Sequence, residues 1–139
     1  MQEELDISNL WYIDKSFIRG NVSKLLQEHD IIMSTANSKE LVGKSCYVYH
    51  IHEQTTFGGF VMVIRARCIN SEYLLYILKS LFVAGYFSKI CTQTTNIANI
   101  NSKTLGEIEI LLPPLNEQSK ICICINKLVE SINKISEAL

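Results

Sequence analysis

Proline and glycine are scarce in this sequence, which has two prolines and six glycines among 139 residues. That composition excludes collagen-like, linker-like and low-complexity chains. Charged residues are also few, at 19% against about 25% in an average soluble domain. The hydrophobic fraction of 47% excludes disorder as the main state. The composition therefore indicates one folded domain, with room for an appended helix but not for two full cores.

The sequence predicts neither a membrane-spanning run nor a secretory leader. The most apolar stretch, residues 73–87, is too short to cross a bilayer, and Lys79 at its centre would cost roughly 2.5–3.5 kcal/mol on insertion. The chain opens on acidic residues, whereas a signal peptide opens on basic ones. Five cysteines, an odd number, lie in apolar runs. We therefore predict a cytoplasmic protein with reduced, buried thiols and no membrane contact.

Runs rich in β-forming residues occur along most of the chain. They predict strands at residues 10–13, 30–34, 46–51, 60–67 and 107–112. In the fourth run, a period of two places Val61 and Val63 on one face and Ile64 on the other.

The period of the apolar residues changes after residue 70. Helical spacing predicts a helix over residues 71–89, capped by Ser71. The polar stretches 34–39 and 92–101 predict loops. We expect an α+β fold in which a twisted, mostly antiparallel sheet packs on this helix. A long, protruding C-terminal helix of the coiled-coil type follows.

The last segment has the most regular pattern in the sequence. Asn116 is a candidate N-cap, and the apolar residues after it follow the 4-3-4-3-4 spacing of a heptad seam. The seam consists of Ile121, Ile125, Leu128, Ile132, Ile135 and Leu139. Its flanking positions hold small or apolar residues, which favours a multi-helix bundle over a two-stranded coil. Because three heptads alone are marginal in water, the helix is expected to pack on a partner helix or, alternatively, on the domain's own core.

Metal-ligand and nucleophile patterns are incomplete. On its predicted strand, Cys46 shares a face with His50 and His52. A zinc site needs four ligands at recognisable spacing, and the second pair, Cys122 and Cys124, points about 200° apart on a helix. A Cys–His pair without a third, orienting group also lacks the arrangement of a nucleophilic site. We therefore expect neither a metal nor a catalytic thiol.

Acid–base and cofactor motifs are missing too. Glu107 and Glu109 share the outer face of one predicted strand, which is typical of a solvated edge. Gly58 and Gly59 lack the further glycines and the following helix of a dinucleotide-binding loop. The sequence therefore predicts a non-catalytic protein without a cofactor.

Charge is distributed unevenly, although the net charge is only −1. Residues 31–105 carry +4, between ends that carry −3 (residues 1–30) and −2 (residues 106–139). Amide and hydroxyl groups, which can read base edges, gather in two loops of this basic middle, where lysines can bind guanine or phosphate. We predict DNA contacts at Thr35, Asn37, Lys39, Lys44, Gln93, Thr94, Thr95 and Asn96. A plain solvated connection is the alternative interpretation of each loop.

The entry to the heptad helix carries a family resemblance. It reads Leu111-Leu112-Pro113-Pro114-Leu115-Asn116-Glu117-Gln118 and resembles the Pro-Pro-Leu-x-Glu-Gln junction of type I restriction–modification specificity subunits. Residues 29–34 are similar to that family's Gly-Asp-Ile-Leu-Ile-Ser strand, with His29 in place of the glycine. Three further segments resemble the family's central strand, its helix and a Gln-containing loop, in the order 60–67, 73–78 and 92–97. The resemblance covers residues 28–139.

The resemblance implies a non-catalytic subunit whose recognition domain reads one half of a bipartite, double-stranded DNA site. It implies a target recognition domain over residues 1–113, with a shortened N-terminal part, and a spacer or dimerisation helix over residues 114–139. The helix would dock the methyltransferase (modification) subunit. Because a full family member has two such domains and two helices, we expect a half-subunit or a fragment that self-associates through this helix.

A protein-interaction module is the alternative function. Such a module docks a methyltransferase subunit or self-associates through the helix without binding DNA. Substitutions in the heptad seam would abolish association under either function. They would change DNA binding only where two chains read DNA jointly.

Overall fold

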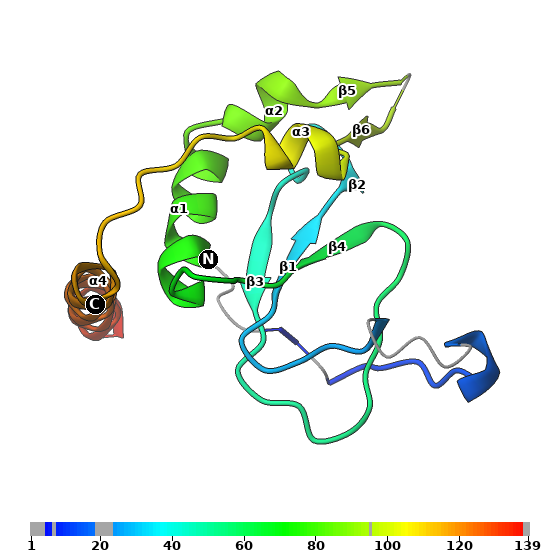
Figure 1. The fold of residues 1–139 in the computed structure, drawn as a ribbon, viewed down its shortest axis with the longest axis horizontal. Coiled ribbons are helices and arrows are strands. Elements are labelled where there is room, and N and C mark those ends of the chain that lie inside the picture. Colours follow the sequence, from blue (N-terminus) through cyan, green and yellow to red (C-terminus); the bar gives the residue numbers. More distant parts are fainter. Residues whose placement is uncertain (1–4, 7, 19–23, 95, 138–139) are drawn as a thin grey trace.

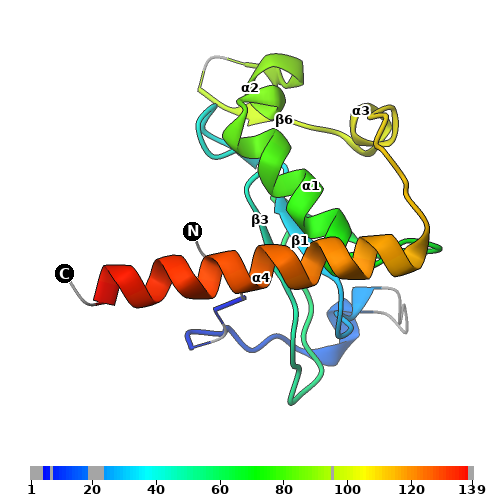
Figure 2. The same ribbon diagram turned by 90° about the vertical axis from the view of Figure 1, so that its left-hand side faces the viewer.

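The computed structural model describes residues 5–6, 8–18, 24–94 and 96–137. Within them, two three-stranded antiparallel sheets lie beside helices α1 (Ser71–Val83) and α2 (Tyr86–Ile90). A longer helix, α4 (Leu115–Glu137), crosses α1 on its outer side (Figures 1 and 2). The mixed architecture and the antiparallel pairing agree with the predicted α+β fold.

The larger sheet has β1 (Ile31–Ser34) at its centre, between β3 (Ser45–Tyr47) and β4 (Val61–Ile64). Ile32 lies opposite both Cys46 and Val63. The strands predicted at 30–34, 46–51 and 60–67 are therefore confirmed in place. The last two are shorter than predicted, because β1 offers only four residues with which its neighbours can pair.

Both faces of this sheet are covered by apolar clusters, and Val63 and Ile64 lie on opposite faces as the period of two predicts. Ile31 and Met33 belong to the main core, with Ile64 packed against the same cluster. Ile32 belongs to a second cluster, against which Val63 packs. Successive residues of a strand point to opposite faces, so a four-residue strand supplies both clusters.

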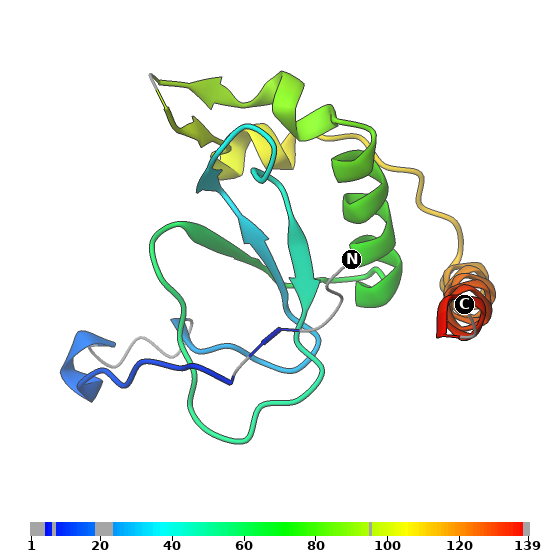
Figure 3. The same cartoon turned by 180° about the vertical axis from the view of Figure 1, so that it is seen from behind.

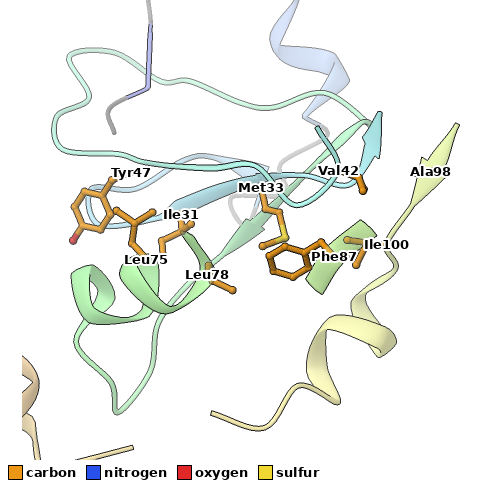
Figure 4. Packing of buried hydrophobic residues seen from close by; sticks show 9 residues of the cluster. All are labelled: Ile31, Met33, Val42, Tyr47, Leu75, Leu78, Phe87, Ala98 and Ile100. Carbon is orange, nitrogen blue, oxygen red and sulfur yellow. The ribbon is translucent and has the colours of Figure 1, made fainter. Parts of the chain in front are cut away.

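The main core lies between the larger sheet and the two helices α1 and α2 (Figure 4). Leu75 and Leu78 reach it from α1, and Phe87 reaches it from α2. The Met33 side chain lies beside the Phe87 ring (Figure 4). Burial of side chains of this size stabilises a fold by about 1.5–3 kcal/mol each.

The helix predicted over residues 71–89 is in fact two helices. Asn70, not Ser71, caps α1, because its side chain accepts a hydrogen bond from the Tyr73 N–H at 3.0 Å. Gly85 then adopts the left-handed conformation with φ 68°, which an α-helix cannot continue. The break turns α2 so that Phe87 enters the core.

The smaller sheet joins three short strands in the order β2-β6-β5. They are β2 (Ala36–Asn37), β5 (Thr92–Gln93) and β6 (Ala98–Asn99). The sequence predicts loops at residues 34–39, which contain β2, and at residues 92–101, which contain β5 and β6. Two-residue strands carry no periodicity, and the pairing depends on segments far apart in the chain (Figures 1 and 3).

Two predicted strands are wrong. Residues 10–13 form no strand, and a short 3₁₀ helix, η1 (Lys15–Phe17), follows them. Residues 107–112 follow a short helix, α3 (Ser102–Gly106), and run without pairing toward Pro113. In neither case does another described segment supply the backbone partners that a strand requires.

The turn before β1 contains a residue with unusual backbone geometry. His29 has a φ of 71°, in the region that favours glycine. Its Nδ1 lies 3.0 Å from the Tyr47 hydroxyl, which lies 2.6 Å from the Ser71 hydroxyl. The left-handed conformation explains why glycine suits this position in the family that residues 29–34 resemble. In this chain, the contact with the Tyr47 hydroxyl holds His29 in place.

A buried ion pair fixes the same turn to β4's end. Asp30 is 1% exposed, and both of its carboxylate oxygens accept hydrogen bonds from the Arg65 guanidinium, at 2.7 and 2.8 Å. Asp30 also accepts from the Gln27 N–H, and Arg65 donates to the Leu25 carbonyl. The ion pair and its hydrogen bonds thus join the turn at Asp30, the end of β4 and the segment around Leu25.

Helix α4 begins directly after Pro114, whose carbonyl accepts a hydrogen bond from the Gln118 N–H at 3.0 Å. The predicted cap, Asn116, lies one residue inside the helix. The buried residues of α4 are Gln118 and Cys122, both in its first half, where it packs across α1 (Figure 2). Among the described residues, no helix is long and apolar enough to cross a membrane.

The heptad seam is partly covered by the rest of the chain. Ile121 and Ile125 line a shallow groove against α1, beside Tyr73 and Tyr76. The seam residues with 63–64% of their surface exposed are Leu128, Ile132 and Ile135. The first half of the helix therefore folds back on its own domain, and the second half extends past α1 (Figure 2). Leu139 lies outside the described residues.

Candidate nucleic-acid interface

The smaller sheet places two predicted contact residues in one row. Asn37 of β2 and Gln93 of β5 each pair with Ala98 of β6. Their backbones are therefore two strand spacings apart, about 10 Å. Both residues are exposed, while Ala98 is buried in the core. Because directly paired residues share one face of a sheet, Ala98 lies between the two amides on the same face. The core covers Ala98, whereas the amides on the two edge strands remain accessible.

The turn between β5 and β6 carries the next predicted contacts. Both the N–H and the hydroxyl of Thr94 donate to the Ile97 carbonyl, at 3.0 and 3.2 Å. These bonds close a tight turn in which Thr94 and Asn96 are exposed. Thr95 lies outside the described residues. The turn is part of a hairpin that stands away from the body of the molecule (Figures 1 and 3).

The Asn37 amide is held in a defined orientation by its own loop. Its Nδ2 donates to the Ser34 hydroxyl at 3.1 Å, and its Oδ1 accepts from the Ser38 N–H at 2.8 Å. One Nδ2 hydrogen and one Oδ1 lone pair remain unused by these bonds. A donor beside an acceptor is the pattern that pairs with the edge of adenine.

Thr35 has little surface to offer a ligand, since it is 8% exposed. Its N–H donates to the Phe60 carbonyl, and its own carbonyl accepts from the Ile100 N–H, both at 2.9 Å. Thr35 therefore joins the two sheets at their junction. We assign it a structural role in place of the predicted contact.

Four lysines lie on elements next to the smaller sheet. Lys39 is exposed and Lys44 is half-buried, both in the loop that follows β2. Lys89 in α2 and Lys103 in α3 are also exposed, on the two helices that flank the smaller sheet (Figure 1). These two lysines were not among the predicted contacts, although the +4 charge of residues 31–105 includes them.

Two charged groups of the basic middle modify this picture. Arg65 donates hydrogen bonds to the Asp30 carboxylate, and these bonds raise the pKa of the guanidinium. The Asp30 carboxylate therefore compensates the positive charge of Arg65 inside the protein. Hydrogen bonds from its own backbone N–H and from Ser38 lower the pKa of Glu40, which therefore stays a carboxylate beside Lys39. The positive charge at this end of the molecule thus comes from the lysines.

Groups suited to metal binding or covalent catalysis do not come together in the described residues. They contain no cluster of three His, Cys, Asp or Glu side chains that could hold a metal ion. His50 is exposed and lies 3.5 Å from the Glu28 carboxylate. Burial raises the pKa of the Cys46 thiol, which disfavours the nucleophilic thiolate.

A cleft of about 680 Å³ lies at the opposite end of the molecule from the amide row. Its walls are residues 10–13 and 53–58, with Lys15 and Ile18. Tyr12 donates to the Glu53 carboxylate there, at 3.3 Å. Its described lining contains no histidine or cysteine, and none of the predicted contacts lies in it.

The chain thus presents an exposed row of amides and hydroxyls, with exposed lysines on neighbouring elements, on a domain from which a helix extends. Residues 7–139 match the type I restriction modification DNA specificity domain, and the chain belongs to this family. The match is to the specificity component, in agreement with the predicted non-catalytic class.

Curated relatives are specificity subunits. The chain is 30% identical over 98% of its length to the type I restriction enzyme MjaX specificity subunit of Methanocaldococcus jannaschii. It is 28% identical over 94% of its length to the EcoKI specificity subunit of Escherichia coli. It spans 33% and 28% of these two relatives, or about a third of their length.

A solved structure has the same fold. Its description concerns complex assembly and conformational transition of the type I R-M system. The TM-score is 0.66, and the match covers 83% of this chain and 26% of the other at 23% identity.

Proposed function

We propose that this chain reads one half-site of double-stranded DNA, as a half or truncated specificity subunit of a type I restriction–modification system. The single observation that carries the proposal is the row formed by Asn37 and Gln93 across the smaller sheet. Two amides held about 10 Å apart on a sheet, beside an exposed turn, suit contacts with base pairs about three steps apart in one groove, since each step rises about 3.4 Å.

The amides and the lysines contribute differently to DNA binding. Amide contacts with base edges discriminate between sequences, by about 1–3 kcal/mol for each well-placed pair. Lysine contacts with phosphates strengthen binding to every sequence and release counterions, which makes affinity fall as salt rises. Substitutions of the two residue types therefore have separable effects.

We expect Gln93→Ala and Asn96→Ala to relax the base preference at one position each, with a loss of roughly 5- to 100-fold in discrimination. Lys39→Ala should weaken binding to all sequences alike and flatten the salt dependence by about one phosphate contact. The measurement is selection from a random duplex library, with and without the methyltransferase subunit, followed by sequencing at two salt concentrations.

Gln54→Ala and Lys127→Ala are matched controls, because each removes the same kind of exposed side chain far from the smaller sheet. Neither control should alter the selected motif or the salt slope. Equal behaviour of Gln93→Ala and Lys39→Ala would show that the smaller sheet does not read bases. A library without enrichment, with the methyltransferase subunit still bound, would favour the alternative interaction module.

We further propose that the distal half of α4 binds a second helix, either from another copy of this chain or in the methyltransferase complex. Supporting this, Leu128, Ile132 and Ile135 remain largely exposed on one stripe of the helix. Covering such a stripe stabilises an assembly by about 25 cal/mol for each Å² of apolar surface removed from water.

Ile132→Asp should therefore weaken self-association by roughly 100-fold or more, since two buried isoleucines are lost and two carboxylates must be desolvated. Sedimentation equilibrium measures the change. Asn133→Asp adds the same charge on a neighbouring exposed position and should leave the association unchanged. A wild-type chain that stays monomeric at high concentration and with the methyltransferase subunit present would contradict the proposed helix interface.

A further inference from the structure

The start of α4 is attached to the start of α1 by a buried amide. Gln118 is 1% exposed, although glutamine is normally a surface residue. Its Oε1 accepts a hydrogen bond from the Asn70 N–H at 2.8 Å, and its Nε2 donates to the Pro113 carbonyl at 2.7 Å. One side chain thus joins the end of the linker, helix α4 and the cap of α1.

Asn70 ties this contact to the body of the domain. Its side chain caps α1 through the Tyr73 N–H, and the Cys122 thiol lies 3.9 Å from the same Asn70 oxygen. The Tyr73 hydroxyl donates to the Leu111 carbonyl of the incoming linker at 3.1 Å. Helix α4 is therefore held by groups that also fix the start of α1.

A second polar contact lies two turns further along α4. The Asn126 amide donates to the Glu72 carboxylate at 3.0 Å and accepts from the Tyr76 hydroxyl. Glu72 and Tyr76 are one turn apart on α1, so they hold Asn126 from the same face. Eight residues separate Gln118 from Asn126, which is about 12 Å along the helix axis.

We propose that Gln118 and Asn126 are positioning residues that set the direction of α4 relative to the candidate DNA-reading sheet. One point of attachment fixes where a rod lies, and two points fix its direction. Hydrogen bonds are directional, whereas the apolar contacts of Ile121 and Ile125 between them tolerate sliding and rotation.

The consequence for function rests on the proposed DNA recognition. Where two recognition domains are joined through their helices, the direction of α4 sets where the second domain lies on the duplex. The two amides would then determine the separation of the two half-sites without touching DNA, and the chain would hold this geometry before any partner binds.

The test is the orientation of α4 in solution, measured by residual dipolar couplings of backbone amides in the full chain. Both chains compared carry Ile132→Asp, so that no second helix can hold α4. Without further changes, one alignment tensor should fit residues 24–94 and 115–137 together. With Gln118→Met and Asn126→Leu added, which keep side-chain size but remove the hydrogen bonds, the tensor magnitude for α4 should fall by at least half.

Ser119→Ala is the matched control, because the Ser119 hydroxyl donates to the Leu115 carbonyl within α4 and, among the described residues, to no group of α1. It should leave the shared tensor intact. If Gln118→Met alone unfolds the domain, Asn126→Leu alone carries the test, since Asn126 is only half-buried.

A shared tensor that persists in the doubly substituted chain would overturn the proposal. It would mean that the apolar contacts or the prolines fix the helix. A purely stabilising role for the two amides would likewise lower thermal stability without changing the tensor. The measurement contains no DNA, so it is independent of the proposed DNA recognition. If the wild-type chain binds no DNA while the doubly substituted chain loses the shared tensor, DNA recognition is refuted and the positioning role is supported.

Discussion

Replacing Arg65 by methionine is expected to lower the free energy of unfolding by about 3–5 kcal/mol. The substitution keeps most of the aliphatic packing but leaves the Asp30 carboxylate, which is almost wholly buried, without its counter-ion. Arg65 itself is one-third exposed, so removal of its own charge costs little. The large effect comes from the carboxylate that remains. Urea unfolding followed by circular dichroism measures it.

The double variant Asp30→Asn, Arg65→Met separates the charge from the shape. Asparagine keeps an oxygen that can accept the Gln27 N–H, which Asp30 accepts at 2.8 Å in the wild type. The double variant should therefore recover half or more of the lost stability. A loss below about 1 kcal/mol for Arg65→Met alone would be typical of an exposed ion pair and would contradict the buried environment of Asp30.

Gly43→Ala should destabilise the fold by roughly 2–5 kcal/mol, through two effects that add. Gly43 has a φ of 87°, where a residue with a Cβ atom is disfavoured by about 1–2 kcal/mol. The new Cβ would also lie 2.3 Å from Cδ2 of Phe87, so the buried ring of α2 would have to move. Overpacking of this kind costs about 1–3 kcal/mol. The midpoint of thermal unfolding reports the sum.

Gly85→Ala isolates the backbone contribution. Its φ of 68° is also left-handed, but an added Cβ would meet only the Ser88 hydroxyl, at 3.6 Å. The expected loss is therefore about 1–2 kcal/mol. Adding Phe87→Ala to Gly43→Ala should relieve most of the overlap, because it removes Cδ2 and Cγ, which would lie 2.3 and 2.4 Å from the new Cβ. The two substitutions together should therefore destabilise less than the sum of their separate effects. Equal losses of stability for Gly43→Ala and Gly85→Ala would mean that the Phe87 side chain moves aside without an energetic cost.

Long periodic segments were predictable from the sequence because their side chains alone determine which face is buried. The alternation of Val63 and Ile64 gave the two faces of β4, and the heptad spacing gave α4. Single residues with special backbone geometry were harder to place. Gly85 divides the predicted helix into α1 and α2. The direction of α2 after this break depends on where the Phe87 side chain packs in the core.

Polar contacts between distant segments could not be predicted. The hydrogen bonds of Gln118 and the ion pair of Asp30 join residues that no pattern of apolar positions links. The candidate site was only partly predictable for the same reason. Composition pointed to Asn37 and Gln93, but the pairing with β6 that places them in one row, and the burial of Thr35, depend on tertiary structure.

The hairpin of β5 and β6 also bears on how such a protein evolves. Its anchors, Ala98 and Ile100, are buried, whereas Gln93, Thr94 and Asn96 protrude and leave the core untouched. Exposed positions of this kind tolerate substitution within about ±0.5 kcal/mol. A lineage can therefore try new side chains at the tip without compensating mutations elsewhere. Under the proposed function, target preference could drift from one sequence to another while the frame that presents it stays unchanged.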